Sequence, residues 1–152
     1  MSDVRTTLLF TVKFLTAPPQ MLGKTPIGDR RIVVVTGGSF EGPKLRGTVE
    51  PGGTDWILLR PDGALQLDVR LCLKTDDGAL IGMTYRGYRH GPPAVIERLN
   101  RGDTVDPSDY YFRTAPFFET SAPRYDWLNR IVCVGIGHRL PEGPVYRVFE
   151  VL

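Results

Sequence analysis

Glycine and proline interrupt this sequence so often that few long helices can form. The 152 residues include 17 glycines and 13 prolines, about a fifth of the chain, against a usual share of roughly 12%. Proline lacks a backbone N–H, and glycine is the residue most costly to hold in a regular element. This density disfavours helix bundles, coiled coils and doubly wound α/β folds. The length is that of one domain, residues 1–152.

Between these interruptions, hydrophobic and polar residues alternate in short runs that predict strands. The clearest run places a leucine or valine at every second position from Leu65 to Leu73. The turns Pro61-Asp62-Gly63 and Asp76-Asp77-Gly78 flank it and favour successive antiparallel hairpins. We therefore expect an all-β chain: a single closed or nearly closed antiparallel β-barrel of eight to ten strands.

One or two short helices complete the expected fold. Pro92 and Pro93 precede a helical segment over residues 94–99, and Gly102 follows its end. Ser121 is placed to cap a second, single helical turn. Residues 16–30 contain three prolines and no periodicity, which predicts a long loop of the kind that often forms a lid or binds a ligand.

Charge and cysteine usage narrow the classes of partner. A formal net charge of +2 is too small to indicate nucleic acid or an anionic membrane as a partner. No signal peptide or apolar run long enough to span a membrane is visible, so we expect a cytoplasmic protein. Cys72 and Cys133 then stay reduced and buried. His90 and His138 lie far apart, and we expect no metal and no cofactor.

Three predicted strands, over residues 31–36, 55–60 and 131–138, are apolar on both faces. Such strands need cover on both sides, and few helices are available to supply it. We therefore expect a homodimer or higher homo-oligomer.

Polar residues close to aromatic ones suggest a site inside the barrel. Asp55 follows a Gly-Gly turn at a strand start, so its carboxylate can lie at the barrel mouth. There it would act as the general base. Arg70 and Arg113 would hold a carboxylate or an enolate. Tyr111, on the same strand face as Arg113, would donate a proton or a hydrogen bond. These four are the candidate catalytic residues.

Trp56 and Trp127 are the candidate ligand-binding residues, with their rings on either side of an apolar group. All six candidates are expected to line one cavity. The alternation leaves a competing arrangement open, in which Leu65 to Leu73 fill the lumen and Arg70 points to solvent. Strand alternation alone does not tell which face is inward.

Several segments of the chain are specific when they are taken together. They include Gly28-Asp29-Arg30-Arg31-Ile32, Gly37-Gly38-Ser39-Phe40-Glu41-Gly42-Pro43, Pro51-Gly52-Gly53-Thr54-Asp55-Trp56, Tyr110-Tyr111-Phe112-Arg113-Thr114 and Tyr125-Asp126-Trp127-Leu128-Asn129. Together they resemble a known family, the uncharacterised domain-of-unknown-function family number three-two-three-seven. The resemblance extends from about Leu8 to Val151 and implies a small, calycin-like antiparallel β-barrel that is often part of an oligomer. It implies no general reaction and no agreed catalytic residues.

Three functions are compatible with this reading. The first is an isomerase, tautomerase or lyase that uses acid–base chemistry in the barrel lumen on an organic acid or aromatic ketone. The second is a non-catalytic barrel that binds a similar small molecule. The third is a structural or partner-binding protein with a packed lumen. A polar cavity would separate the third from the others.

Overall fold

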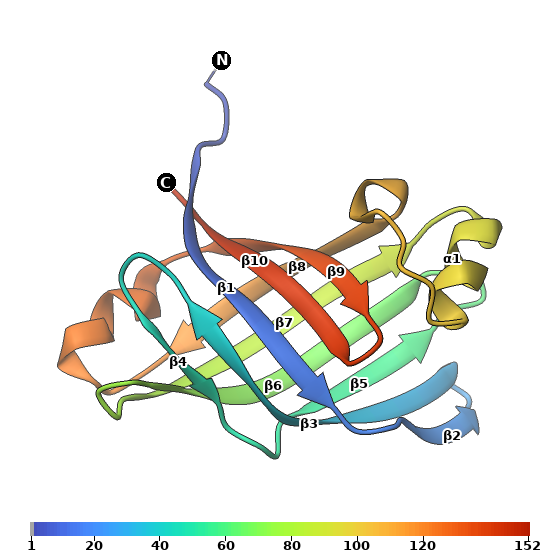
Figure 1. Ribbon diagram of the computed structural model, residues 1–152, viewed down its shortest axis with the longest axis horizontal. Coiled ribbons are helices and arrows are strands. Elements are labelled where there is room, and N and C mark those ends of the chain that lie inside the picture. The colour runs from blue at the N-terminus through green and yellow to red at the C-terminus, as the bar shows by residue number, and fades with distance from the viewer. Residues whose placement is uncertain (1) are drawn as a thin grey trace.

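The computed structural model describes residues 2–152 and confirms the all-β prediction. Its strands form a closed antiparallel barrel of eight strands with two additional strands (Figure 1). The strands are β1 (Thr6–Thr16), β2 (Gln20–Lys24), β3 (Asp29–Glu41), β4 (Arg46–Val49), β5 (Thr54–Leu59), β6 (Leu65–Thr75), β7 (Leu80–His90), β8 (Tyr111–Glu119), β9 (Cys133–Leu140) and β10 (Gly143–Val151).

The barrel closes through β1, which pairs with β10 on one side and with β3 on the other. From β10 the ring continues through β9, β8, β7 and β6. Both β4 and β5 lie between β3 and β6, β4 beside the end of β3 and β5 beside its start. The short hairpin turns of the sequence supply the antiparallel neighbours, as predicted.

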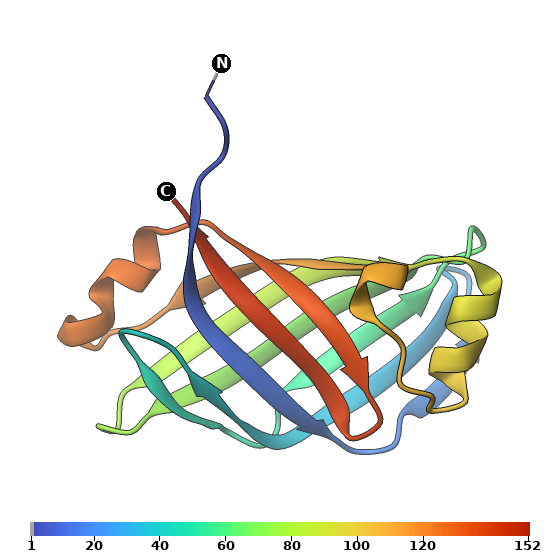
Figure 2. The ribbon, with the colours of Figure 1, turned by 45° about the horizontal axis from the view of Figure 1, so that its top comes forward.

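Helices lie at both ends of the barrel (Figures 1 and 2). The predicted helix is present as α1 (Pro93–Asn100), with a 3-10 turn, η1 (Pro107–Asp109), near it. At the opposite end lies a longer 3-10 segment, η2 (Pro123–Arg130). Asp77 accepts hydrogen bonds of 3.0 Å from Arg124 and Tyr125 of η2, which fixes this segment against the turn after β6.

Residues 16–30 are not the unbroken loop that their prolines suggested. β2 forms within them and pairs with the first residues of β3. The backbone of β3 supplies the hydrogen-bond partners of β2. The sequence pattern of β2 alone does not predict this strand.

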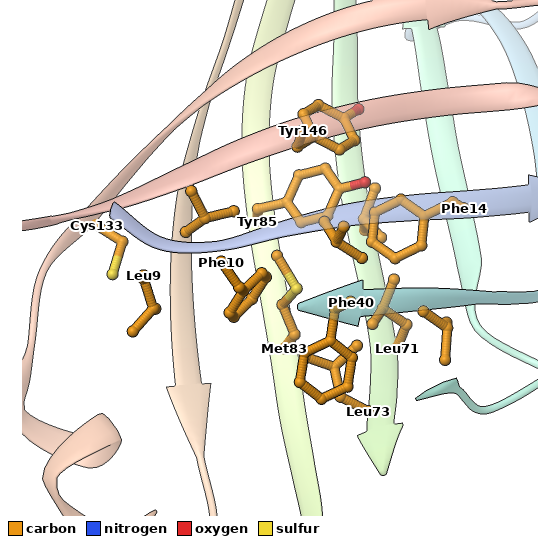
Figure 3. Packing of buried hydrophobic residues seen from close by; sticks show 14 of the residues in the cluster. Leu9, Phe10, Phe14, Phe40, Leu71, Leu73, Met83, Tyr85, Cys133 and Tyr146 are labelled. Atoms are coloured by element: carbon orange, nitrogen blue, oxygen red, sulfur yellow. The ribbon is translucent and has the colours of Figure 1, made fainter. Parts of the chain in front are cut away.

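Half of the lumen is filled by side chains, in the arrangement that the sequence left as the alternative. Leu65 to Leu73 point inward at every second position and are buried. In the half that lies towards η2, the ring centroid of Phe10 is 5.3 Å from that of Phe40 (Figure 3). It is 5.7 Å from the ring centroid of Phe118. These close aromatic contacts form a packed hydrophobic core.

Gly137 on β9 makes room for one of the inner aromatic rings. A Cβ at this position would lie 2.6 Å from Cγ of Phe112 on the neighbouring strand β8. Glycine therefore lets the Phe112 ring lie flat against the backbone of β9.

Both cysteines are free thiols, as expected. Cys133 is buried, and burial raises its pKa to about 12. Cys72 is only half-buried, because it lies on the outer face of β6.

Candidate functional site

The half of the barrel nearest α1 encloses a cavity of about 420 Å³. It is lined at one end of the barrel by the chain at the end of β1 (Thr16, Ala17 and Pro19), by the end of α1 (Leu99 and Asn100) and by Gly143 at the start of β10. We call this end the mouth. The walls are mostly apolar and aromatic, with Phe14 and Phe112 among them. A concave apolar space with a few polar groups is the usual form of a small-molecule site.

Asp55 is the one carboxylate that lines the cavity among the residues that the structure describes. On β5 it pairs with Val33 of β3 and with Val69 of β6. Burial raises the pKa of Asp55 to about 7; the backbone N–H of Asp68 lowers it, and the charge of Asp68 raises it further. A carboxyl group with this pKa can both donate and accept a proton near neutral pH.

Tyr85 and Tyr146 lie beside Asp55 in the cavity. Val69 pairs with Tyr85, so Asp55 and Tyr85 lie at one level of the barrel, two strands apart. The tyrosine rings are 5.3 Å apart and edge to face, and their hydroxyls point in the same direction (Figure 3).

Burial raises the pKa of both tyrosines, and the charge of Asp55 raises it further. Both phenols are therefore protonated at neutral pH, available as hydrogen-bond donors.

Three arginines line the cavity between these groups and the mouth: Arg31 on β3, Arg89 on β7 and Arg139 on β9. Each lies nearer to the mouth along its strand than Asp55 and the tyrosines. Arg89 follows Tyr85 by four residues, and Arg139 lies two residues beyond Gly137, which pairs with Tyr146. Arg31 lies two residues before Val33, which pairs with Asp55. Burial and the charges of Arg139 and Arg31 lower the pKa of Arg89. The mouth half of the cavity is thus strongly positive.

The structure does not bring the six predicted site residues into one cavity; only Asp55 lines it. Arg70 is exposed on the outer face of β6, because the inward positions are taken by Leu65 to Leu73. Arg113 and Tyr111 do share a face, as predicted, but it is the outer face of β8. There the Arg113 guanidinium stacks over the Tyr111 ring at 5.4 Å.

The two tryptophans also lie outside the cavity. Trp56 is 46% exposed on the outer face of β5, next to the guanidinium of Arg30. Trp127 is half-buried in η2 at the opposite end of the barrel, where Lys44 lies over its ring at 4.9 Å. The expected pair of rings around a ligand therefore does not form.

Sequence reasoning missed the two tyrosines and three arginines of the cavity. Arg89 carried a readable signal, because it continues the alternation of Ile81, Met83 and Tyr85 along β7. Arg31 and Arg139 stand at the ends of strands that are apolar on both faces, where alternation does not identify the inner one.

A second depression, of about 750 Å³, lies outside the barrel between α1 and the β5–β6 turn. Arg60 and Asp62 in its wall form an ion pair with each other.

Over residues 2–152, no group of three or more His, Cys, Asp or Glu side chains is placed to hold a metal ion. Within the same range, none of the helices has the length and apolar character needed to cross a membrane.

Known proteins similar to this chain share its architecture. A UPF0311 protein of Rhodopseudomonas palustris is 36% identical over 149 residues, which cover 98% of this chain and 97% of that protein. The crystal structure of a beta-barrel like protein from Acinetobacter baumannii superposes with a TM-score of 0.86 at 39% identity, covering 100% of this chain and 98% of that one.

A more distant relative is named as an enzyme. The hydroalkoxylation enzyme phnH of Penicillium herquei is 27% identical over 134 residues, which cover 88% of this chain and 74% of that protein. Residues 4–151 match the family model described as Protein of unknown function (DUF3237), which confirms the resemblance seen in the sequence: the chain belongs to this family.

Proposed function

We propose that this protein is an enzyme that transfers protons to and from a small organic molecule bound in the barrel lumen. In this proposal Asp55 is the general acid and base. The observation that carries it is a single carboxyl group with a pKa of about 7, set in an apolar cavity beside two protonated tyrosines. Catalytic carboxyl groups are commonly tuned towards neutrality in this way.

The reaction class that fits these groups is isomerisation, tautomerisation, or addition and elimination at a C=C bond. Asp55 would remove a proton from one atom of the substrate and return a proton to another. Tyr85 and Tyr146 would donate hydrogen bonds to an oxygen on which negative charge develops. The name of the Penicillium herquei relative supports the addition reaction, because hydroalkoxylation adds the O and the H of an alcohol O–H bond to the two carbons of a C=C bond.

In such an addition the O–H bond and the C=C π bond break, while a C–O and a C–H bond form. One carboxyl group can serve both ends of this change: its ionised oxygen takes the hydroxyl proton, and its protonated form supplies the proton to carbon. A pKa near 7 keeps both forms populated.

Two other functions remain as alternatives. A non-catalytic binding barrel would use the same cavity without needing the Asp55 proton. A structural protein with a packed lumen is disfavoured by a cavity of about 420 Å³ with polar groups in its wall.

The proposal is tested with neutral probes of both reactions: β-tetralone for deuterium exchange at the carbon beside its carbonyl, and ortho-allylphenol for ring closure. We expect the wild-type protein to accelerate at least one of them, and Asp55→Asn to lower that rate by about 10²–10⁴-fold. Asp76→Asn is the matched control, since Asp76 is exposed in the turn after β6, where it pairs with Arg46 of the outer surface. Equal rates for Asp55→Asn and wild type would contradict the proposal.

A further inference from the structure

We infer that Arg31, Arg89 and Arg139 form a carboxylate-binding subsite in the mouth half of the cavity. The molecule that enters the barrel is accordingly an organic acid, held by its carboxylate near the mouth with its apolar body towards Asp55. This inference rests on the proposed function only in that the same cavity receives the substrate.

The three guanidinium groups lack the partners that the outer arginines have. Ion pairs with aspartates occupy Arg46, Arg124 and other arginines of the outer surface. None of the three cavity arginines forms an ion pair with a carboxylate among residues 2–152.

Two of these arginines also carry buried N–H groups without a hydrogen-bond acceptor in the described part of the chain. They are the Nε groups of Arg31 and Arg89. A buried donor without an acceptor destabilises the fold, and a buried charge without a counter-charge does so more strongly. Both costs are relieved when an anion binds, which makes this arrangement typical of a preformed anion site.

The charge balance of the cavity agrees with this assignment. Three guanidinium groups face one carboxyl group whose pKa is about 7, so the net charge of the lining is at least +2 at neutral pH. The arginines repel one another, as the effect of Arg139 and Arg31 on Arg89 indicates. A carboxylate suits such a site, because the planar guanidinium fork binds its two oxygens together.

The order of groups along the barrel gives the orientation of the bound acid. The charges of Arg89 and Arg139 act on Tyr146, and the charge of Asp55 acts on both Tyr146 and Tyr85. Asp55 and Tyr85 lie at one level of the barrel, and Arg89 lies four residues further towards the mouth than Tyr85. A carboxylate at the arginines places the apolar part of the molecule against Phe14 and Phe112 and its reacting atoms near Asp55.

Binding of β-naphthoate, compared with its neutral amide, tests the subsite by calorimetric titration. We expect wild type to bind β-naphthoate at least tenfold more tightly than β-naphthamide. Arg89→Met should weaken β-naphthoate binding by about tenfold to a hundredfold and leave β-naphthamide binding unchanged. Arg89→Lys keeps the charge but not the fork and should lie in between.

Arg113→Met is the control, because Arg113 lies on the outer face of the strand next to Arg89. It should bind both probes as wild type does. Circular dichroism establishes that each variant is folded. Should Arg89→Met prove unfolded, Arg31→Met and Arg139→Met carry the same expectation. Equal affinity of wild type for the acid and its amide, or equal loss of both in the folded variants, would overturn the inference.

The two proposals fail in different experiments. Turnover of β-tetralone or ortho-allylphenol that depends on Asp55, together with no preference for β-naphthoate, would overturn the carboxylate subsite and leave the proposed function standing. Tight, Arg89-dependent binding of β-naphthoate without any Asp55-dependent turnover would overturn the proposed function and leave the carboxylate subsite standing.

Discussion

The backbone N–H of Asp68 donates a hydrogen bond of 3.1 Å to Oδ1 of Asp55. The contact joins β5 to β6 and holds the Asp55 carboxyl group at the barrel wall. Asp68 acts on the pKa of Asp55 in opposite directions, since its N–H stabilises the ionised form while its own carboxylate repels it.

Removing only the Asp68 charge should therefore lower the pKa of Asp55. In Asp68→Asn the backbone hydrogen bond stays and the repulsion disappears. The pKa should fall below about 7 but stay above the ordinary aspartate value of 3.8, because burial, the largest cause, is unchanged. Carbon-13 NMR titration of the side-chain carboxyl groups measures it. A rise, or no change, would show that the Asp68 charge does not reach Asp55.

The stability of the fold should fall as pH rises from 5 to 8. Between pH 3.8 and 7 the unfolded chain has released the Asp55 proton while the folded chain retains it, so the folded state binds more protons. At about 1.4 kcal/mol per pKa unit, the part of this loss between pH 5 and 8 is about 2–3 kcal/mol. Urea unfolding followed by tryptophan fluorescence measures it.

Asp55→Asn should remove this pH dependence and stabilise the fold at pH 8 by roughly 2–4 kcal/mol, since the amide has no charge to bury. The amide oxygen still accepts the Asp68 N–H. If Asp55→Asn instead unfolds the protein, Asp55 has a structural role in the turn before β5 rather than a catalytic role.

Gly137→Ala should destabilise the barrel by roughly 1–3 kcal/mol, because its Cβ would overlap the Phe112 ring and force it to move. Gly37→Ala is the matched control in β3, where an added Cβ meets no atom within 4 Å. Thermal unfolding of both variants measures the difference. Equal melting temperatures would mean that the Phe112 ring has room to shift.

The oligomer expected from the sequence stays a prediction, and the outer faces of β8 and β9 are where we expect the second copy. Phe117 is 52% exposed there, and Val132 and Val134 beside it are exposed as well. Light scattering at micromolar concentration should give the mass of a dimer or larger assembly for wild type, and the mass of a monomer for Phe117→Glu. A monomeric wild type would refute the prediction.

The barrel and its helix were predictable because local patterns specify them. The alternation from Leu65 to Leu73 sets the face of β6, and Pro92, Pro93 and Gly102 bound α1. β2 escaped prediction because pairing with β3 creates it.

The site was less predictable, because alternation gives two faces without saying which is inner. Asp55 was placed correctly from its position after a Gly-Gly turn. Tyr111 and Arg113 were assigned to the wrong face, and Phe112 between them is the buried residue. Which face of β8 points into the lumen is determined only by the pairing of β8 with β7 and β9.

The same barrel has a packed half of the lumen around Phe10 and a hollow half around Asp55. Substitutions in these two halves have different consequences. A change at Leu67 or Val33 alters the shape of the cavity without touching the aromatic cluster of Phe10. The shape of the cavity can therefore diverge among members of this family while the framework persists. For an engineer, the mouth half is the place to vary, and the half near η2 is the part to leave alone.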